Sequence, residues 1–312
     1  MLESLTTHSW ADLVPIPQND GGQDALACIA YPEDYRIGME YLRALLHNDE
    51  LSDRALDLTT DLIAINAAHY TTWAFRNRIL LTIPSDLQQE LEWTEELAAT
   101  NSKNYQIWNH RERIVDRLQS PTREIPFTTS LLLEDSKNYH VWTYRQWVIR
   151  RFGLWDGELE FTSQLIESDV RNNSAWNHRH FVLFGPGLQL APEVIVDEIG
   201  YVQHAIEKAP QNLSAWNYLR GQTGGDLDSL EEYCMGFAPG PMDDEQTTEI
   251  IDISKPAVSV HAMEMLADIY AARGELDRAI EYWKLLAEKF DSMRENYWRF
   301  RISSSKQEKS QV

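Results

Sequence analysis

The chain has 312 residues, of which 43% are hydrophobic and 25% charged, and its 49 acidic against 28 basic residues give a net charge of −21. Such a negative field repels nucleic-acid phosphates and anionic lipid surfaces, which argues against both as bulk partners. No apolar run approaches the roughly 20 residues of a membrane-spanning helix, so membrane insertion is not expected.

The two cysteines, Cys28 and Cys234, are too few for a disulfide framework or a thiolate metal site. The beginning of the chain lacks the basic segment and apolar core of a secretory signal, and its ends carry no lipidation motif. We therefore expect a cytoplasmic protein.

The first thirty residues are polar and contain Pro15 and Pro17, which favours a loose N-terminal arm over residues 1–30. Residues 33–66 then carry an apolar stripe at helical spacing, which predicts a first pair of helices. The stripe consists of Met39, Leu42, Leu45 and Leu46.

Five segments aligned on a tryptophan follow, spaced by 35, 34, 34 and 40 residues. Their tryptophans are Trp73, Trp108, Trp142, Trp176 and Trp216. A period near 34 residues is the length of one helical hairpin in an α-solenoid. The repeat therefore predicts an all-α fold, a right-handed superhelix of hairpins similar to tetratricopeptide arrays. We expect one domain over residues 31–302 and a frayed tail over 303–312.

Each of the first four tryptophans is followed three residues later by an arginine, on the same helix face. These arginines are Arg76, Arg111, Arg145 and Arg179, whereas Arg220 lies four residues after the fifth tryptophan. We expect the tryptophans to be buried between hairpins and the arginines to pair with acids of an adjacent helix.

Helix starts can be predicted from capping residues. Ser85 followed by Gln88 matches a capping box for a helix over residues 85–100. Ser174 and Ser214 are candidate caps for two of the tryptophan-bearing helices.

The region after the fifth tryptophan departs from the repeat. Residues 239–256 form an acidic, proline-containing connection. Residues 266–283 then resemble a tetratricopeptide hairpin, with Gly274 at the turn and Ala279 where the helices approach closely. Further on, Trp298 stands three residues before Arg301, a late echo of the repeat.

The usual phosphate-binding, nucleophile-elbow and zinc-protease motifs do not occur, so the chain alone does not resemble an enzyme. No two histidines of the tryptophan segments have metal-binding helical spacing, and no metal site is expected. His110 and His178 occupy the same position two repeats apart. This position favours a buried hydrogen-bonding role.

Basic residues recur five positions before the tryptophans, at Lys103, Lys137 and Arg171, with Gln211 in the fourth place. Equivalent turns of stacked hairpins line one edge of a solenoid. The row could meet an anionic ligand such as a diphosphate near helix N-termini. The alternative, which spacing alone favours, is a set of solvated turn residues.

The stretches KNYHVWTYRQWVIRRFGLWDGEL, within residues 137–182, and KNYQIWNHRE, residues 103–112, resemble the α-subunits shared by protein farnesyltransferase and type I geranylgeranyltransferase. The resemblance covers about residues 35–220. It implies a crescent of hairpins around a β-subunit, and an enzyme that is inactive without that subunit. The expected substrates are farnesyl or geranylgeranyl diphosphate and proteins ending in a CaaX motif.

The resemblance also implies how the site is shared. No cofactor is expected on this chain; zinc belongs to the β-subunit, and magnesium is a candidate companion of the diphosphate. Lys137 would contact the diphosphate, Tyr139 would lie beside the isoprenoid pocket, and Gln106 would reach the C-terminal carboxylate of the peptide. His140, Asn172 and Asn173 are further candidates from the neighbouring turns.

Two other functions remain open from the sequence. One is the α-subunit of a Rab geranylgeranyltransferase, which requires an escort protein, and the other is a non-catalytic solenoid adaptor that binds peptides. The sequence does not choose between farnesyl and geranylgeranyl, because that pocket would lie on the partner.

Overall fold

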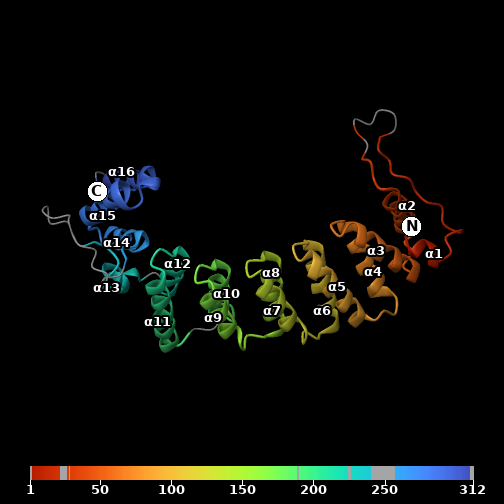
Figure 1. Ribbon diagram of the computed structural model, residues 1–312, viewed down its shortest axis with the longest axis horizontal. Coiled ribbons are helices and arrows are strands. Elements are labelled where there is room, and N and C mark those ends of the chain that lie inside the picture. The colour runs from red at the N-terminus through yellow and green to blue at the C-terminus, as the bar shows by residue number, and fades with distance from the viewer. Residues whose placement is uncertain are drawn as a thin grey trace. The chain divides into compact units, whose positions relative to one another are not determined.

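The computed structural model describes residues 2–21, 27, 29–187, 190–223, 226–239 and 257–309. The regular elements in this part of the chain are all helical, as predicted (Figure 1). None of its helices is both long and apolar enough to cross a bilayer. Apart from Pro239, the predicted acidic connection at 239–256 lies outside the described residues.

The chain divides into two compact units, Met1–Leu154 and Trp155–Val312. A single domain over residues 31–302 and a right-handed superhelix therefore stay predictions. The repetition of helical hairpins is confirmed within each unit.

The first unit begins with a short helix and a longer one, and continues with three hairpins in which consecutive helices pack together. Its helices are α1 (Ser4–Thr7), α2 (Glu33–His47), α3 (Asp53–Ile65), α4 (Tyr70–Thr82), α5 (Leu87–Asn101), α6 (Tyr105–Leu118), α7 (Glu124–Glu134) and α8 (Tyr139–Phe152). The second helices of successive hairpins also touch, α4 with α6 and α6 with α8 (Figure 1).

The second unit carries two more such hairpins and a C-terminal group of helices. Its elements are α9 (Glu158–Ser168), α10 (Asn173–Phe184), α11 (Pro192–Lys208), α12 (Leu213–Gln222), η2 (Leu227–Leu230), α13 (Glu231–Met235), α14 (Val260–Ala272), α15 (Leu276–Leu285), the π-helical turn η3 (Leu286–Phe290), η4 (Ser292–Arg294) and α16 (Glu295–Lys309). Gly274, at φ +79°, forms the turn between α14 and α15, as predicted. Ala279 is fully buried where these helices meet.

The repeated tryptophans are buried, and each indole N–H donates to the carbonyl six residues earlier, over 2.8–2.9 Å. The pairs are Trp73–Ala67, Trp108–Ser102, Trp142–Ser136, Trp176–Val170 and Trp216–Pro210. The bond satisfies the indole in the interior and fixes the turn in front of each second helix. The predicted role of the tryptophans is confirmed.

The arginines that follow the tryptophans tie three helices together. Arg111 of α6 donates to both oxygens of Glu124 on α7, over 2.7 and 2.9 Å, and to the carbonyl of Leu91 on α5. Arg76 and Arg179 make the same contacts one repeat earlier and two repeats later, with the buried Glu90 and Glu198. The predicted pairing with acids of an adjacent helix is confirmed.

The predicted serine caps were wrong. Asn172 and Asn212 cap α10 and α12, because a carboxamide two residues before Ser174 or Ser214 already accepts the first free backbone N–H groups. Asp86, one residue after Ser85, caps α5 in the same manner.

The N-terminal segment differs from the expected loose arm. Trp10 and Leu13 are buried against α2 and α3, and Arg54 on α3 holds Asp12 through two hydrogen bonds of 2.8 and 2.9 Å. Apolar side chains between its polar residues explain this packing, since they cover the exposed end of the first helical pair.

The first helical pair, α2 and α3, was predicted correctly, and Leu42 and Leu45 lie in its core. At the other end, α16 continues to Lys309, so residues 303–309 of the expected frayed tail are helical, and 310–312 lie outside the described residues. Trp298 is buried, but its indole donates to the Asp291 carboxylate and not to a turn carbonyl.

Candidate functional site

The turns before α6 and α8 form one exposed edge of the first unit, and we call residues 103–106 and 137–140 the turn edge. Asn138 caps α8 by accepting from two backbone N–H groups, and its amide donates to the Ser102 hydroxyl over 3.1 Å. Asn104 caps α6 by accepting from the backbone N–H of Gln106 over 2.8 Å. These contacts hold the two turns side by side, with two helix N-termini opening on the same edge.

The Asp135 carboxylate contacts both lysines of the turn edge, Lys103 through its ammonium and Lys137 through its backbone N–H. The Lys103 ammonium lies 3.4 Å from Oδ2 of Asp135, and Oδ1 of Asp135 accepts from the backbone N–H of Lys137 over 3.2 Å. Both lysine side chains are exposed. Two exposed lysines on neighbouring turns thus lie near one acid, on a chain that is strongly acidic overall, and lysines grouped in this way can attract an anion.

Aromatic side chains stand beside these cations. Tyr105 and Tyr139, the first residues of α6 and α8, are 62% and 74% exposed. The His140 ring lies between them, with ring centroids 6.3 Å from Tyr105 and 5.7 Å from Tyr139. The structure thus brings Lys137, Tyr139 and His140 together on one turn.

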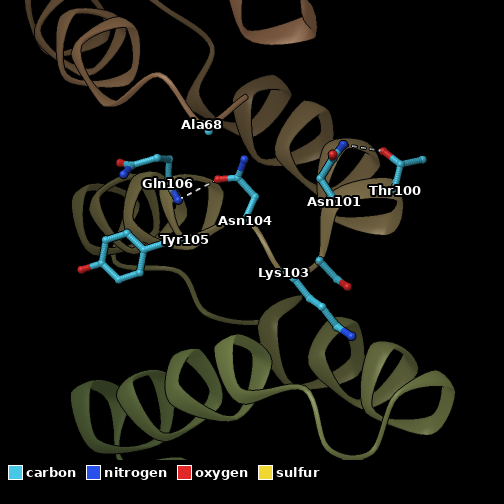
Figure 2. Close-up of a pocket in the computed structure, with 8 residues that line it drawn as sticks. Ala68, Thr100, Asn101, Lys103, Asn104, Tyr105 and Gln106 are labelled. Carbon is cyan, nitrogen blue, oxygen red and sulfur yellow. Dashed lines mark hydrogen bonds between the residues drawn. The ribbon is translucent and has the colours of Figure 1, made fainter. Parts of the chain in front are cut away.

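Gln106 belongs to the neighbouring helix and lines an open depression of about 560 Å³ with Lys103 and Tyr105 (Figure 2). In Figure 2 the Lys103 side chain extends toward the α7–α8 hairpin, whereas Tyr105 and Gln106 leave α6 on the other side. Gln106 is half-buried, so its carboxamide remains within reach of a ligand.

The remaining candidates lie in the second unit. Asn172 is fully buried and its Oδ1 caps α10, whereas Asn173, the first residue of that helix, is exposed. We therefore keep Asn173 as a candidate for substrate contact and leave Asn172 with its capping role. Arg171 is exposed at its turn. Gln211 bonds the Val258 carbonyl over 2.6 Å, so it anchors the segment before α14.

The buried histidines have the expected hydrogen-bonding role. His110 and His178 each place Nε2 against a buried glutamate, at 2.7 Å from Glu90 and 2.8 Å from Glu158. Burial alone would raise the pKa of Glu90, but hydrogen bonds from His110 and Arg76 outweigh it and hold the pKa at about 2. Burial lowers the pKa of His110, so its imidazole is neutral.

Tyrosine alternates with histidine at this position. Tyr144 and Tyr218 donate their phenol hydrogens to Glu124 and Glu198 over 2.6 Å. Glu90, Glu124 and Glu198 are thus each shared between an arginine of the preceding helix and a histidine or tyrosine of the following helix. Within the described residues, no group of three or more histidine, cysteine or acidic side chains could hold a metal ion.

Sequence reasoning missed Asp135, which anchors both lysines, and Asn77 of α4, which lines a groove against α6 together with His110. An acid two residues before the lysine was visible in LEDSKNYH. Nothing in the spacing of Asn77 distinguished it from a solvated helix residue.

The profile of the protein prenyltransferase alpha subunit repeat matches four segments, each covering one hairpin from α3–α4 to α9–α10. The matched residues are 52–83, 87–118, 121–152 and 155–185.

Relatives named protein farnesyltransferase/geranylgeranyltransferase type-1 subunit alpha align over nearly the whole chain. The Candida albicans protein is 37% identical over 95% of this chain and 97% of its own length, and the Dictyostelium discoideum protein 35% identical over 95% and 92%. Shorter alignments to the Arabidopsis thaliana and Schizosaccharomyces pombe proteins reach 43% and 48% identity but span only 25% and 30% of those relatives.

A solved structure gives the same picture. A chain of Candida albicans protein geranylgeranyltransferase-I, in a complex with GGPP, superposes with a TM-score of 0.83 and 34% sequence identity. The superposition covers 96% of this chain and 99% of that one.

Proposed function

This chain belongs to the family of protein farnesyltransferase/geranylgeranyltransferase type-1 α-subunits. We propose that it works as the α-subunit of a heterodimeric CaaX prenyltransferase. Its partner is a β-subunit, and its substrates are an isoprenyl diphosphate and proteins ending in a CaaX motif. Few cysteines and this substrate class support a cytoplasmic location.

The turn edge is the observation that carries the catalytic part of the proposal. Transfer of an isoprenyl group forms a carbon–sulfur bond to the cysteine thiolate and breaks the carbon–oxygen bond to diphosphate. Negative charge grows on the departing diphosphate. Lys137, exposed at the N-terminus of α8 with its backbone fixed by Asp135, supplies a preorganised cation for this charge.

The neighbouring residues orient the two substrates. Tyr139, 74% exposed beside Lys137, offers an apolar ring to the isoprenoid chain, and His140 supports it. Gln106 donates its amide to the C-terminal carboxylate of the peptide. Asn173 is a further contact, on the first turn of α10.

We propose, from the family resemblance, that the catalytic zinc belongs to the β-subunit. Zinc would activate the cysteine thiolate there. Magnesium, where it takes part, accompanies the diphosphate.

The proposal is tested with the chain co-purified with a farnesyltransferase β-subunit, zinc, farnesyl diphosphate and a CaaX peptide. Lys137→Ala should lower the single-turnover rate by roughly a hundredfold, the usual loss for one preorganised donor, and leave the heterodimer assembled. Lys103→Ala is the matched control, since it removes the same side chain one repeat earlier and should have a much smaller effect.

Transfer by Lys137→Ala at the wild-type rate would remove the catalytic role of this lysine. A stable complex without CaaX transfer would redirect the function to the Rab enzyme or to another β-subunit. Failure of the two chains to associate would favour a solenoid adaptor.

A further inference from the structure

A groove of about 270 Å³ runs between α4 and α6 of the first unit. Trp73 and Asn77 line it from α4, and Gln106, His110 and Arg113 from α6. The proposed function uses only Gln106 at the rim of this groove, and it gives the deeper part of the groove no role.

Two polar atoms of side chains that line this groove have no hydrogen-bond partner among the described residues: Nδ2 of Asn77 and Nδ1 of His110. Both side chains are deeply buried, at 4% and 2% exposure. Leaving such atoms unpaired costs free energy, and most native examples have a reason. The two atoms thus point to a group that the lone chain does not provide.

The hydrogen-bonding character of both atoms follows from their neighbours. The Glu90 carboxylate can only accept, so the Nε2 of His110 that faces it over 2.7 Å carries the hydrogen. In the neutral ring Nδ1 is then a lone-pair acceptor. Nδ2 of Asn77 is a donor, so a complementary group must accept at one point and donate at another.

The equivalent groove of the second unit, between α12 and α14, is built differently. Arg220 stands at the position of Asn77 and pairs with Asp268 over 2.8 Å, and Met265 stands at the position of His110. In α8 the position of His110 holds Tyr144, whose one polar atom is already bonded to Glu124. His261, which lines the α12–α14 groove, also has a buried Nδ1 without a partner among the described residues, but Asn77 has no unpaired counterpart there, because Arg220 is bonded to Asp268. An unpaired amide donor together with an unpaired histidine nitrogen is therefore what distinguishes the α4–α6 groove from these two places.

Building on the proposed function, we propose that the α4–α6 groove receives a neutral side chain of the β-subunit that both donates and accepts, a hydroxyl or a carboxamide. An ammonium group could not accept from Asn77, and a carboxylate would face the lone pair of His110. Because neither buried atom is open to water, the incoming side chain enters with a rotation of Gln106 or Tyr105.

The rim of the groove fits a protein partner better than a small solute. Tyr70 and Tyr105, the first residues of α4 and α6, flank it and are 70% and 62% exposed. Exposed tyrosines around a polar socket are typical of interface residues that bury much area at low entropic cost. Relatives of this chain are themselves named as subunits, which supplies the partner.

The test compares the affinity of the heterodimer with the stability of the chain alone. Asn77→Ala removes an unpartnered donor, so the free chain should unfold at the same or a higher temperature. The dissociation constant with a type I geranylgeranyltransferase β-subunit should rise about tenfold, which corresponds to about 1.4 kcal/mol. Gln164→Ala, which removes an exposed carboxamide from α9, is the matched control and should change neither value.

His110→Tyr tests the acceptor with a residue that the repeat already uses at this position. A tyrosine there should bond Glu90 as Tyr144 bonds Glu124, which keeps the fold but removes Nδ1 and fills the groove. Its dissociation constant should rise at least as much as that of Asn77→Ala.

Wild-type affinity for the β-subunit in both variants would contradict the proposal that the α4–α6 groove receives a β-subunit side chain, while leaving the proposed function intact. Loss of chain stability in Asn77→Ala would overturn it too, by giving Asn77 a role within the fold. If the wild-type chain binds no β-subunit at all, the proposed function is wrong, and the proposed role of the α4–α6 groove is wrong with it.

Discussion

The buried connections of the first unit and its turn edge are built from the same repeat but follow different rules. In the interior, Arg76 and Arg111 make the same bonds to a buried glutamate and to a carbonyl of the preceding helix. At the edge, Gln106 and His140 stand at equivalent helix positions and donate their backbone N–H groups to a capping asparagine in the same way, yet their side chains differ. The Gln106 carboxamide lines an open depression, whereas the His140 ring lies between two tyrosines.

The difference shows which positions packing dictates. An interior slot must satisfy a fixed set of buried polar groups, so few residues fit it. An edge slot faces solvent and is free to serve a ligand. The edge is therefore where residues that differ between repeats, such as Gln106 and His140, are the first to examine for a ligand contact.

The largest expected effect lies in the interior. Arg111→Ala would leave Glu124 buried without its charge partner, so it should lower the free energy of unfolding by about 3–5 kcal/mol. The contrasting variant is Lys103→Ala on the exposed edge, expected to change it by less than about 0.5 kcal/mol. Urea unfolding of both measures the comparison directly.

Similar losses for the two variants would contradict the division into a packed interior and a free edge. A small loss for Arg111→Ala alone would mean that the existing 2.6 Å hydrogen bond from Tyr144 is enough to stabilise the buried Glu124 carboxylate.

A second prediction concerns how the stability of the buried interior depends on pH. Burial lowers the pKa of His110, so below pH 6.5 the unfolded chain binds a proton at this histidine that the folded chain does not bind. The free energy of unfolding therefore falls on acidification. The pKa of Glu90, held at about 2, adds a further loss as pH falls below about 4.5.

His110→Tyr provides the comparison, because tyrosine has no group that titrates in this range. Between pH 7.5 and pH 5.5, the thermal unfolding temperature of the wild type should fall by more than that of the variant. Parallel curves would show that His110 does not remain neutral in the fold.

More of the contacts in the interior than at the turn edge could be predicted from the sequence. A period near 34, set by the tryptophans and their arginines, gave the hairpins, the buried indoles and the arginine–acid pairs. These follow from spacing because the same packing problem recurs in each repeat. Histidine at the position of His110 and His178 was also interpretable, as a buried group that needs a partner.

The sequence was less informative where a single residue decides. Helix starts were placed on Ser174 and Ser214, because serine and asparagine cap equally well and only geometry selects between neighbours. The partners of Asn77 depend on how α4 faces α6, which no local pattern encodes. The roles of Lys137, Tyr139 and Gln106 came from a family resemblance and stay predictions.

The smallest expected effect contrasts two adjacent asparagines that lie on either side of this division. Asn172 is buried and accepts from the backbone N–H groups of Ser174 and Ala175, whereas Asn173 is exposed on the first turn of α10. Asn172→Ala should cost about 1 kcal/mol, as the loss of an N-cap does. Asn173→Ala should stay within about 0.5 kcal/mol.

The same pair separates stability from function, which a single variant cannot do. If Asn173 contacts substrate, its alanine variant lowers CaaX transfer by the heterodimer while the unfolding midpoint stays in place. The Asn172 variant does the reverse, because its side chain acts on the start of α10 and not on a ligand. Equal effects of both variants on transfer and on unfolding would mean that this turn responds as one unit, and the boundary between interior and edge would then lie outside it.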